Sequence, residues 1–313
     1  MAHQHNHSVP EDGTMDTRLW ASAALNMAIT GAELVGGLLS GSLALLSDAA
    51  HNLSDVAAVV VALWARHLSR RPPTVRHTYG FKRAEVMAAL ANAVVLIGVT
   101  ALIGREAVVR LLHPEPVAQG IMLLVALVAL IGNVASVLLL RHHEKDDVNV
   151  RSAFLHMAQD ALASLAVVVA ALLARTAVGP YVDPVAALLV GFAVLRSALS
   201  LAWETLSTLL EGAPRDVDLR SLVGDVGQEF PPIRMHHVHL WENGPGQRLL
   251  TAHVTVPADL DGTAIEQLLA RIKEFVHERW EVNHSTLEPE VVGCSDTSLL
   301  GNWDASHGGE RPR

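Results

Sequence analysis

Residues 43–63 read LALLSDAAHNLSDVAAVVVAL, an apolar stretch that contains a few polar and acidic side chains. A membrane-spanning helix needs about 20 predominantly apolar residues, so this stretch is long enough to cross a bilayer. Stretches of the same kind lie before and after it. We therefore predict an all-α domain of six transmembrane helices, at Leu19 to Leu39, Leu43 to Leu63, Ala84 to Val109, Val117 to Leu140, Ala153 to Ala174 and Val182 to Leu201.

The composition of the 313 residues agrees with a membrane protein. Half of the residues are hydrophobic and the mean hydropathy is +0.32, whereas aromatic residues make up only 4%. Few aromatic residues favour closely packed helices over an aromatic-girdled barrel. The single cysteine, Cys294, excludes an internal disulfide and a thiolate zinc cluster. The formal net charge of −9 argues against nucleic acid as a partner, because phosphate binding needs clustered basic residues.

Basic residues gather in two of the predicted loops. Loop 66–83 carries six Lys and Arg residues and loop 141–151 carries three. Loops of this kind face the cytoplasm, and an even number of spans then places both termini on that side of the inner membrane. The opening MAHQHNHSVPEDG lacks the segments of a signal peptide, so we expect it to stay on the protein. Near the outer end of the third span, we expect Arg105 or Arg110 to pair with Glu106.

Beyond Leu210 the hydropathy falls and the pattern alternates between helix and strand. We predict helices at 218–230 and 263–280 and strands at 234–241, 248–257 and 282–287, which together form a compact α+β module. The expected domains are a His-containing tail (1–17), the six-span domain (18–210), a cytoplasmic metal-binding and dimerisation domain (211–291) and a C-terminal tail (292–313).

The same H-x-x-x-D motif occurs in two predicted spans, as His51 and Asp55 in the second and as His156 and Asp160 in the fifth. Residues four apart on a helix lie about 40° apart around its axis, so each His and Asp share one face. Two imidazoles and two carboxylates complete a tetrahedral shell of nitrogen and oxygen ligands, which suits Zn²⁺. Zinc is therefore the leading candidate for the ion.

Membrane energetics favour a functional role for the two aspartates. An aspartate at the centre of a membrane helix costs on the order of 2.5–3.5 kcal/mol. A cation offsets this cost, and without the cation the carboxylates take up protons. Competition between metal and protons for the same atoms is the physical basis of an antiporter. The alternative is that His and Asp only hydrogen-bond to each other across two packed helices. Asp48, on the same face as His51, is either a further acidic group near the site or a structural hydrogen-bond partner.

His77 in the basic segment RHTYGFKRAE is a second possible cation contact. The alternative is a solvated loop histidine, because Arg76, Lys82 and Arg83 repel a cation. From its position, Lys82 is also a candidate partner for an ion pair with Glu211 after the last span.

Five histidines of the C-terminal module are further candidate ligands. Alternate residues of a strand share one face, so His237, His239 and His253 point away from the predicted core together. With His284 or Glu288 they form a candidate second zinc site, at a surface where two copies meet. The alternative is a set of unrelated histidines. The five are His236, His237, His239, His253 and His284.

From about Leu19 to Glu288 the chain resembles the cation diffusion facilitator family, in particular the bacterial zinc exporters related to vertebrate zinc transporters. The segments that carry the resemblance are SLALLSDAAHNLSD (42–55), HTYGFKRAE (77–85), HMAQD (156–160), LLEGAP (209–214), HHVHLW (236–241) and TAHVTV (251–256). The resemblance implies a homodimer in the lipid bilayer with six spans per subunit and a cytoplasmic αββαβ domain of metallochaperone-like fold. It also implies zinc export in exchange for protons by alternating access.

Carried over by position, the family's transport site is His51, Asp55, His156 and Asp160. In the loop site of some relatives a second histidine accompanies the one that matches His77, and Phe81 stands in its place here. In the tail the family pattern favours His236 with His253 and His284, whereas strand alternation favours His237 and His239. A β-bulge in the first strand would reconcile the two, because one extra residue reverses the faces.

The sequence therefore predicts a proton-coupled Zn²⁺ efflux transporter that is not an enzyme and uses no organic cofactor, with Zn²⁺ as substrate and as a candidate regulatory ion. One alternative is a membrane-embedded metalloenzyme, in which the four ligands hold a catalytic metal with an open position for water. The chain contains neither an HExxH nor a GxSxG motif to support it. Another alternative is a metal sensor that does not transport.

Overall fold

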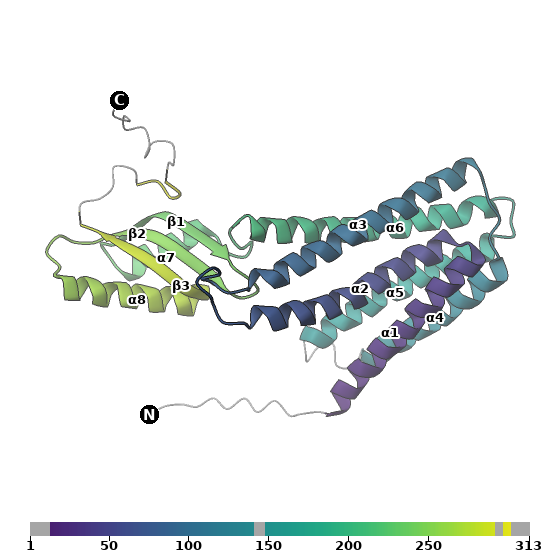
Figure 1. Cartoon of the computed structure of the whole chain (residues 1–313), viewed down its shortest axis with the longest axis horizontal. Helices are drawn as coiled ribbons and strands as arrows, with labels where there is room; N and C mark the ends of the chain where they lie inside the picture. Colours follow the sequence, from purple (N-terminus) through teal and green to yellow (C-terminus); the bar gives the residue numbers. More distant parts are fainter. Residues whose placement is uncertain (1–12, 141–147, 292–296, 302–313) are drawn as a thin grey trace. The chain divides into compact units, whose positions relative to one another are not determined.

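The computed structural model describes residues 13–140, 148–291 and 297–301, and within them the chain forms eight helices and three strands (Figure 1). By its internal contacts the chain divides into two compact units. The first comprises Met1–Val60 and Asn92–Ser200, and the second comprises Val61–Ala91 and Leu201–Arg313. Helices α2, α3 and α6 run from one unit into the other.

Six long helices precede the first strand. They are α1 (Gly13–Ser40), α2 (Leu43–Ser69), α3 (Arg83–Leu112), α4 (Gln119–Leu140), α5 (Val148–Leu173) and α6 (Gly179–Leu209). Described stretches of α2 to α6 are long and apolar enough to cross a membrane, and the described side chains of α1 form a shorter apolar stretch, Ala24–Ser40. The prediction of a helical membrane domain is confirmed.

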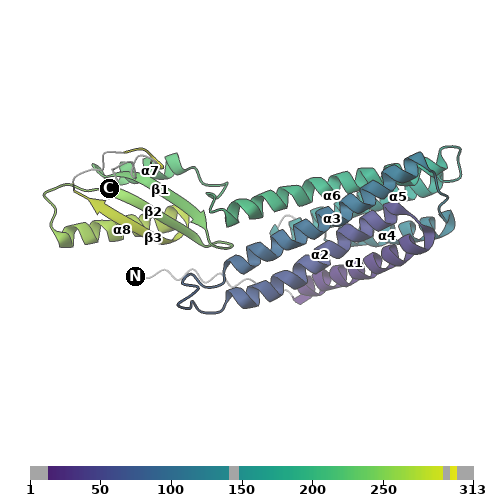
Figure 2. The same cartoon turned by 45° about the horizontal axis from the view of Figure 1, so that its top comes forward.

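Small residues let the helices of the first unit approach one another closely. A Cβ on Gly36 of α1 would lie 2.6 Å from Val125 Cγ2 of α4, and one on Gly132 of α4 would lie 2.5 Å from Ile29 Cδ1 of α1. Helices α3 and α6 pack through Leu96 and the buried pair Val194 and Ala198 (Figure 2). Alanines fill much of the other core, as expected where close van der Waals packing holds membrane helices together.

Asp183 of α6 caps the first turn of α2, the helix that carries the first H-x-x-x-D motif. Its buried carboxylate accepts hydrogen bonds from Leu43 N at 2.8 Å, from Ala44 N at 3.3 Å and from the Ser42 hydroxyl. The first N–H groups of a helix have no partner within the helix and carry a partial positive charge. Asp183 therefore satisfies these groups and fixes where α2 begins.

We expect Asp183→Ala to lower the melting temperature of the detergent-solubilised protein, because two N–H groups and one hydroxyl lose their acceptor. Hydrogen bonds to a charged group contribute about 1.5–3 kcal/mol each. Asp183→Asn keeps one acceptor oxygen and should lose less stability than the alanine variant. Thermal unfolding followed by intrinsic fluorescence measures the difference, and equal melting temperatures for all three proteins would contradict the capping role.

The expected ion pair with Glu106, near the C-terminal end of α3, is made by Arg110. Its guanidinium pairs with Glu106 at 3.4 Å and with Glu115 at 3.7 Å, and it also donates to the carbonyl of Gly41. Gly41 has φ +70° in the turn between α1 and α2. Arg110 therefore ties α3 to the turn that joins the first two helices.

The C-terminal module has the predicted order αββαβ. Its elements are α7 (Leu219–Glu229), β1 (Arg234–Glu242), β2 (Arg248–Thr255), α8 (Gly262–Trp280) and β3 (Val282–Glu290). The sheet has the order β1-β2-β3, with β1 antiparallel and β3 parallel to β2. Both helices pack against it through one buried core, to which α7 gives Leu222 and Val226 and α8 gives Ile272 and Val276. The α+β prediction is confirmed.

An ion pair in the second unit links the start of α3 to the segment after α6. Arg83 Nη2 lies 2.7 Å from Glu211 Oε1, and Arg83 Nε donates to Asn243 Oδ1 at 3.2 Å. The prediction that Lys82 pairs with Glu211 is wrong, because Arg83 forms this ion pair. The backbone of Lys82 packs against Gly244 instead, where an added Cβ would lie 2.9 Å from the Lys82 carbonyl oxygen.

Candidate metal centre

The two H-x-x-x-D motifs meet inside the first unit, between α2 and α5. His156 Nε2 lies 3.5 Å from Asp55 Oδ2 on the other helix and 3.6 Å from Asp160 Oδ2 on its own. His51 Nε2 lies 3.7 Å from the same Asp55 oxygen, and the two imidazole rings are 6.1 Å apart. The structure therefore brings together all four residues that the sequence motif predicts.

Several side-chain atoms of this centre lack hydrogen-bond partners among the described residues. Within the described residues, Asp55 Oδ2, His51 Nδ1 and both Asp160 oxygens are buried without a hydrogen-bond partner. The His–Asp distances of 3.5–3.7 Å exceed those of protein hydrogen bonds, so the structural alternative, in which these groups satisfy each other, is not what the geometry shows. Buried polar atoms without partners are costly. A divalent cation would satisfy them.

Exposure differs among the four side chains in a way that suits a site reached from one side. Asp160 is 1% exposed, whereas Asp55 is 37% exposed and His51 and His156 are intermediate. Three ligand atoms, from His51, His156 and Asp160, lie within 4.8 Å of one another. Asp160 is thus the most buried of the four side chains and Asp55 the most exposed.

Asp48 is buried one turn before His51 on α2 and interacts with Glu33 of α1. It is not among the groups that converge on the centre, although its charge interacts with Asp160. Asp48 was predicted as an acidic group near the site, whereas Glu33 was not. The available signal was a lone carboxylate within the apolar stretch Ala24–Ser40.

A second cluster of possible ligands lies on the sheet of the C-terminal module. Glu290 of β3 joins two histidines, with its Oε2 atom 3.0 Å from His236 Nε2 and its Oε1 atom 2.7 Å from His253 Nδ1. Glu288 lies 3.7 Å from His253 Nε2. The three ligand atoms of His236, His253 and Glu290 lie within 4.8 Å of one another. Glu290 was not predicted as a ligand, because the last strand was expected to end at residue 287 and extends to Glu290.

A bulge in β1 explains why strand alternation and the family pattern disagreed. The register of β1 against β2 shifts between His236 and His239, and His237 has φ +47°. The rings of His236 and His237 therefore both approach the His253 ring, at 5.4 and 4.8 Å. A segment beyond β3 lies along the bulge, since Ser298 O accepts a hydrogen bond from the backbone N–H of His237.

Within the described residues, neither cluster of possible ligands includes His239 or His284. His239 is paired with Thr251, and partial burial, with the charges of His237 and His253, lowers its pKa. His284 of β3 is paired with Leu249 of β2. It comes six residues before Glu290, a distance of roughly 20 Å along a strand. Its ring lies 6.3 Å from Tyr79.

His77 is exposed in the loop before α3, with its ring 4.5 Å from the ring of Phe81. Its backbone N–H donates to the Thr74 hydroxyl at 3.1 Å. Among the described residues, no cluster of three possible metal ligands includes His77. The structure thus places an aromatic ring, not a second ligand, beside this histidine.

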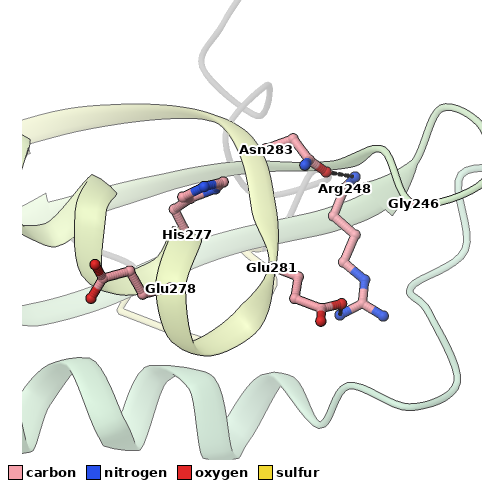
Figure 3. A pocket seen from close by; sticks show the side chains of 6 residues that line it. All are labelled: Gly246, Arg248, His277, Glu278, Glu281 and Asn283. Atoms are coloured by element: carbon pink, nitrogen blue, oxygen red, sulfur yellow. Dashed lines mark hydrogen bonds and ion pairs between the residues drawn. The ribbon is translucent and has the colours of Figure 1, made fainter. Parts of the chain in front are cut away.

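A cavity of about 530 Å³ in the C-terminal module is lined by other residues, among them Arg248, Glu281 and Asn283 (Figure 3). Burial disfavours the charge of Arg248, but the carboxylates of Asp216 and Glu242 hold its pKa above the usual value. The guanidinium also donates to the carbonyl oxygen of Trp280 at 3.1 Å. These contacts make Arg248 a structural link between the strands and α8.

Residues 19–210 match the family of the cation efflux transmembrane domain. The chain belongs to this family of membrane transporters. It is 41% identical over 305 residues to the zinc transporter ZitB of Pectobacterium atrosepticum, which covers 97% of this chain and 94% of that protein. It is 40% identical over 299 residues to ZitB of Escherichia coli (strain K12), covering 94% of both chains. It is also 32% identical over 303 residues to a cadmium, cobalt and zinc/H(+)-K(+) antiporter of Bacillus velezensis, covering 96% of both.

Proposed function

We propose that this chain exports Zn²⁺ from the cytoplasm in exchange for protons, through a site formed by His51, Asp55, His156 and Asp160. The observation that carries the proposal is the meeting of the two H-x-x-x-D motifs, where buried side-chain atoms have no hydrogen-bond partner in the described part of the chain. The zinc transporters among its relatives support zinc as the substrate.

The chemistry of the four side chains couples zinc to protons. Neutral imidazole and ionised carboxylate bind Zn²⁺, so each ligand must lose its proton before the ion binds. Protonation of Asp55, Asp160 or either histidine then weakens binding and helps release the ion. Alternating access of the site to the two sides of the membrane turns this competition into exchange, with protons moving inward as zinc moves outward.

The proposed setting is the inner membrane, with both termini in the cytoplasm. The basic loop 66–83 supports this orientation. The proposed domains remain a tail (1–17), the membrane domain (18–210), a cytoplasmic domain (211–291) and a second tail (292–313), and the family match over 19–210 supports the second of these. We also propose a homodimer in the lipid bilayer, in which the C-terminal module forms part of the subunit interface.

Reconstituted full-length protein tests the main proposal. Liposomes that contain the protein should take up zinc when a pH difference is imposed, and zinc addition should move protons in the opposite direction. Zinc, cadmium, cobalt and manganese compared side by side give the substrate range. Catalytic turnover without ion flux would favour the metalloenzyme alternative, and zinc binding without flux would favour a sensor.

We further propose that His236, His253 and Glu290 hold a regulatory zinc ion in the C-terminal module, with His237 and His239 beside it. Their nitrogen and carboxylate oxygen donors suit zinc, and Glu290 already contacts both histidines. His284 lies too far along β3 to join them, and His77 lies in a loop with Phe81. A regulatory role is supported by the separation of this cluster from the membrane helices along the chain.

His236→Ala and His253→Ala are each expected to remove about one zinc ion per chain, because each removes one of three ligands. Metal content after dialysis of the full-length protein against a fixed zinc concentration measures the loss. His284→Ala is the matched control, since this histidine is on the same sheet but outside the cluster, and its zinc content should equal that of the wild type. A loss in the control, or none in the other two, would contradict the assignment.

A further inference from the structure

Two buried carboxyl groups lie together beside the proposed transport site. Glu33 of α1 and Asp48 of α2 are both 0% exposed, and their carboxyl groups interact directly. Asp160, the most buried residue of the proposed transport site, interacts electrostatically with both. The pair is therefore close enough to respond to whether the site holds a cation, yet neither residue is one of its four proposed ligands.

The hydrogen bonds around this pair leave most of its oxygens unsatisfied. Glu33 Oε2 accepts a hydrogen bond from Asn52 Nδ2 at 3.0 Å. Within the described residues, Glu33 Oε1 and both Asp48 oxygens are buried without a hydrogen bond of ordinary geometry. Two neighbouring carboxylates cannot both stay ionised at such a place, because burial and mutual repulsion both disfavour the second charge.

The charged group that acts on both members of the pair is an acid. From α5 the pair faces the acid Asp160 and the hydroxyl of Ser164. The Ser164 hydroxyl accepts a hydrogen bond from Asn133 Nδ2 of α4 at 3.1 Å. On α1 the Thr30 hydroxyl donates to the backbone of its own helix. Among the described residues, the ionisable side chain that acts on both members of the pair is thus another carboxyl group, and the imidazole of His51 follows Asp48 by one turn on α2.

We propose that Glu33 and Asp48 share one proton and act as a proton-binding station for the exchange. The proposal rests on the zinc-for-proton exchange proposed above. With zinc absent, burial and the repulsion between the two carboxylates favour the protonated pair, in which one carboxyl donates to the other. When zinc binds, its positive charge favours the ionised pair, and the pair releases its proton.

The station lies between the transport site and one end of the helices. Glu33 is seven residues before the end of α1 and Asp48 is five after the start of α2, so each is about 8–10 Å along its helix from the turn that joins them. In the proposed orientation this turn faces the outside of the cell. A proton that enters from there reaches Glu33 and Asp48 before it reaches Asp160.

Glu33→Gln and Asp48→Asn test the station because each removes one ionisable group and keeps its size. In full-length protein, zinc affinity measured by titration calorimetry should stay within about threefold of wild type, because the four ligands remain. The protons released for each zinc ion bound should fall by about one in either variant, and transport should depend less on external pH. Glu115→Gln, an exposed carboxylate in the loop after α3, is the matched control and should match the wild type.

Infrared difference spectra of the wild-type protein give a second readout that needs no variant. We expect a band from a protonated carboxyl group that is lost when zinc is added at neutral pH. Unchanged proton release and pH dependence in both variants would overturn the station, and so would the absence of this band. Failure of the exchange itself is distinguishable, because wild-type liposomes would then show no coupled flux, whereas failure of the station alone leaves that flux intact.

Discussion

Asp160→Asn is expected to reduce zinc flux in proteoliposomes at least about 100-fold, since loss of a direct ligand should exceed the 10–100-fold effects of mutating groups behind the ligands. Asp160 is 1% exposed and both of its oxygens lack a hydrogen-bond partner among the described residues. An amide has the same shape but no charge to attract the ion. Zinc flux measured with an internal fluorescent indicator gives the rate.

The control for this prediction separates loss of the ligand from loss of the fold. Because a buried carboxylate without a donor is costly, the neutral Asp160→Asn variant should elute as the wild type does and melt at the same temperature or above. Asp55→Asn should also lose flux, since Asp55 is the residue that contacts histidines on both helices. Flux close to the wild-type rate in either variant would remove the proposed site.

His156→Asp is expected to lower the ratio of zinc flux to manganese flux at least about tenfold. The imidazole of His156 lies between the two aspartates of the site, so the substitution would leave one nitrogen ligand and three carboxylates. Carboxylates suit larger and more oxygen-loving ions, whereas imidazole favours zinc. Liposome uptake with zinc, cadmium and manganese at equal concentrations measures the ratio.

Two histidine variants on α2 complete this experiment. His51→Asp should shift the ion preference in the same direction, because His51 faces Asp55 within the site. His67→Asp places the same new charge on an exposed position near the end of that helix and should leave the preference unchanged. An unaltered ratio in His156→Asp, or an equal change in His67→Asp, would count against nitrogen ligands as the source of selectivity.

The helices and the meeting of the two H-x-x-x-D motifs could be predicted because their signals are local. Runs of about 20 apolar residues define spans, and the spacing of His51 and Asp55 places both on one face of a helix. The repeat at His156 and Asp160 then indicated which two helices meet. The order of elements after residue 210 followed from alternating patterns and turn residues in the same way.

Contacts between distant parts of the sequence could not be predicted in the same way. Asp183 caps a helix about 140 positions earlier, and no pattern near Asp183 marks that partner. Glu33 meets Asp48 only because α1 and α2 pack together. The bulge at His237 breaks the alternation from which faces were assigned, and Glu290 is in a part of β3 where the pattern no longer alternates.

The hydrogen bonds at the β1 bulge bear on where the chain can be shortened. The backbone N–H groups of His237 and Val238 donate to the carbonyl oxygens of Ser298 and Leu299, which lie beyond the last strand. Deleting everything after residue 291 would leave these two main-chain donors without their acceptors. It would also remove Leu299, which packs against the core of the C-terminal module. Purification tags are therefore better attached after Gly301 than directly after the end of β3.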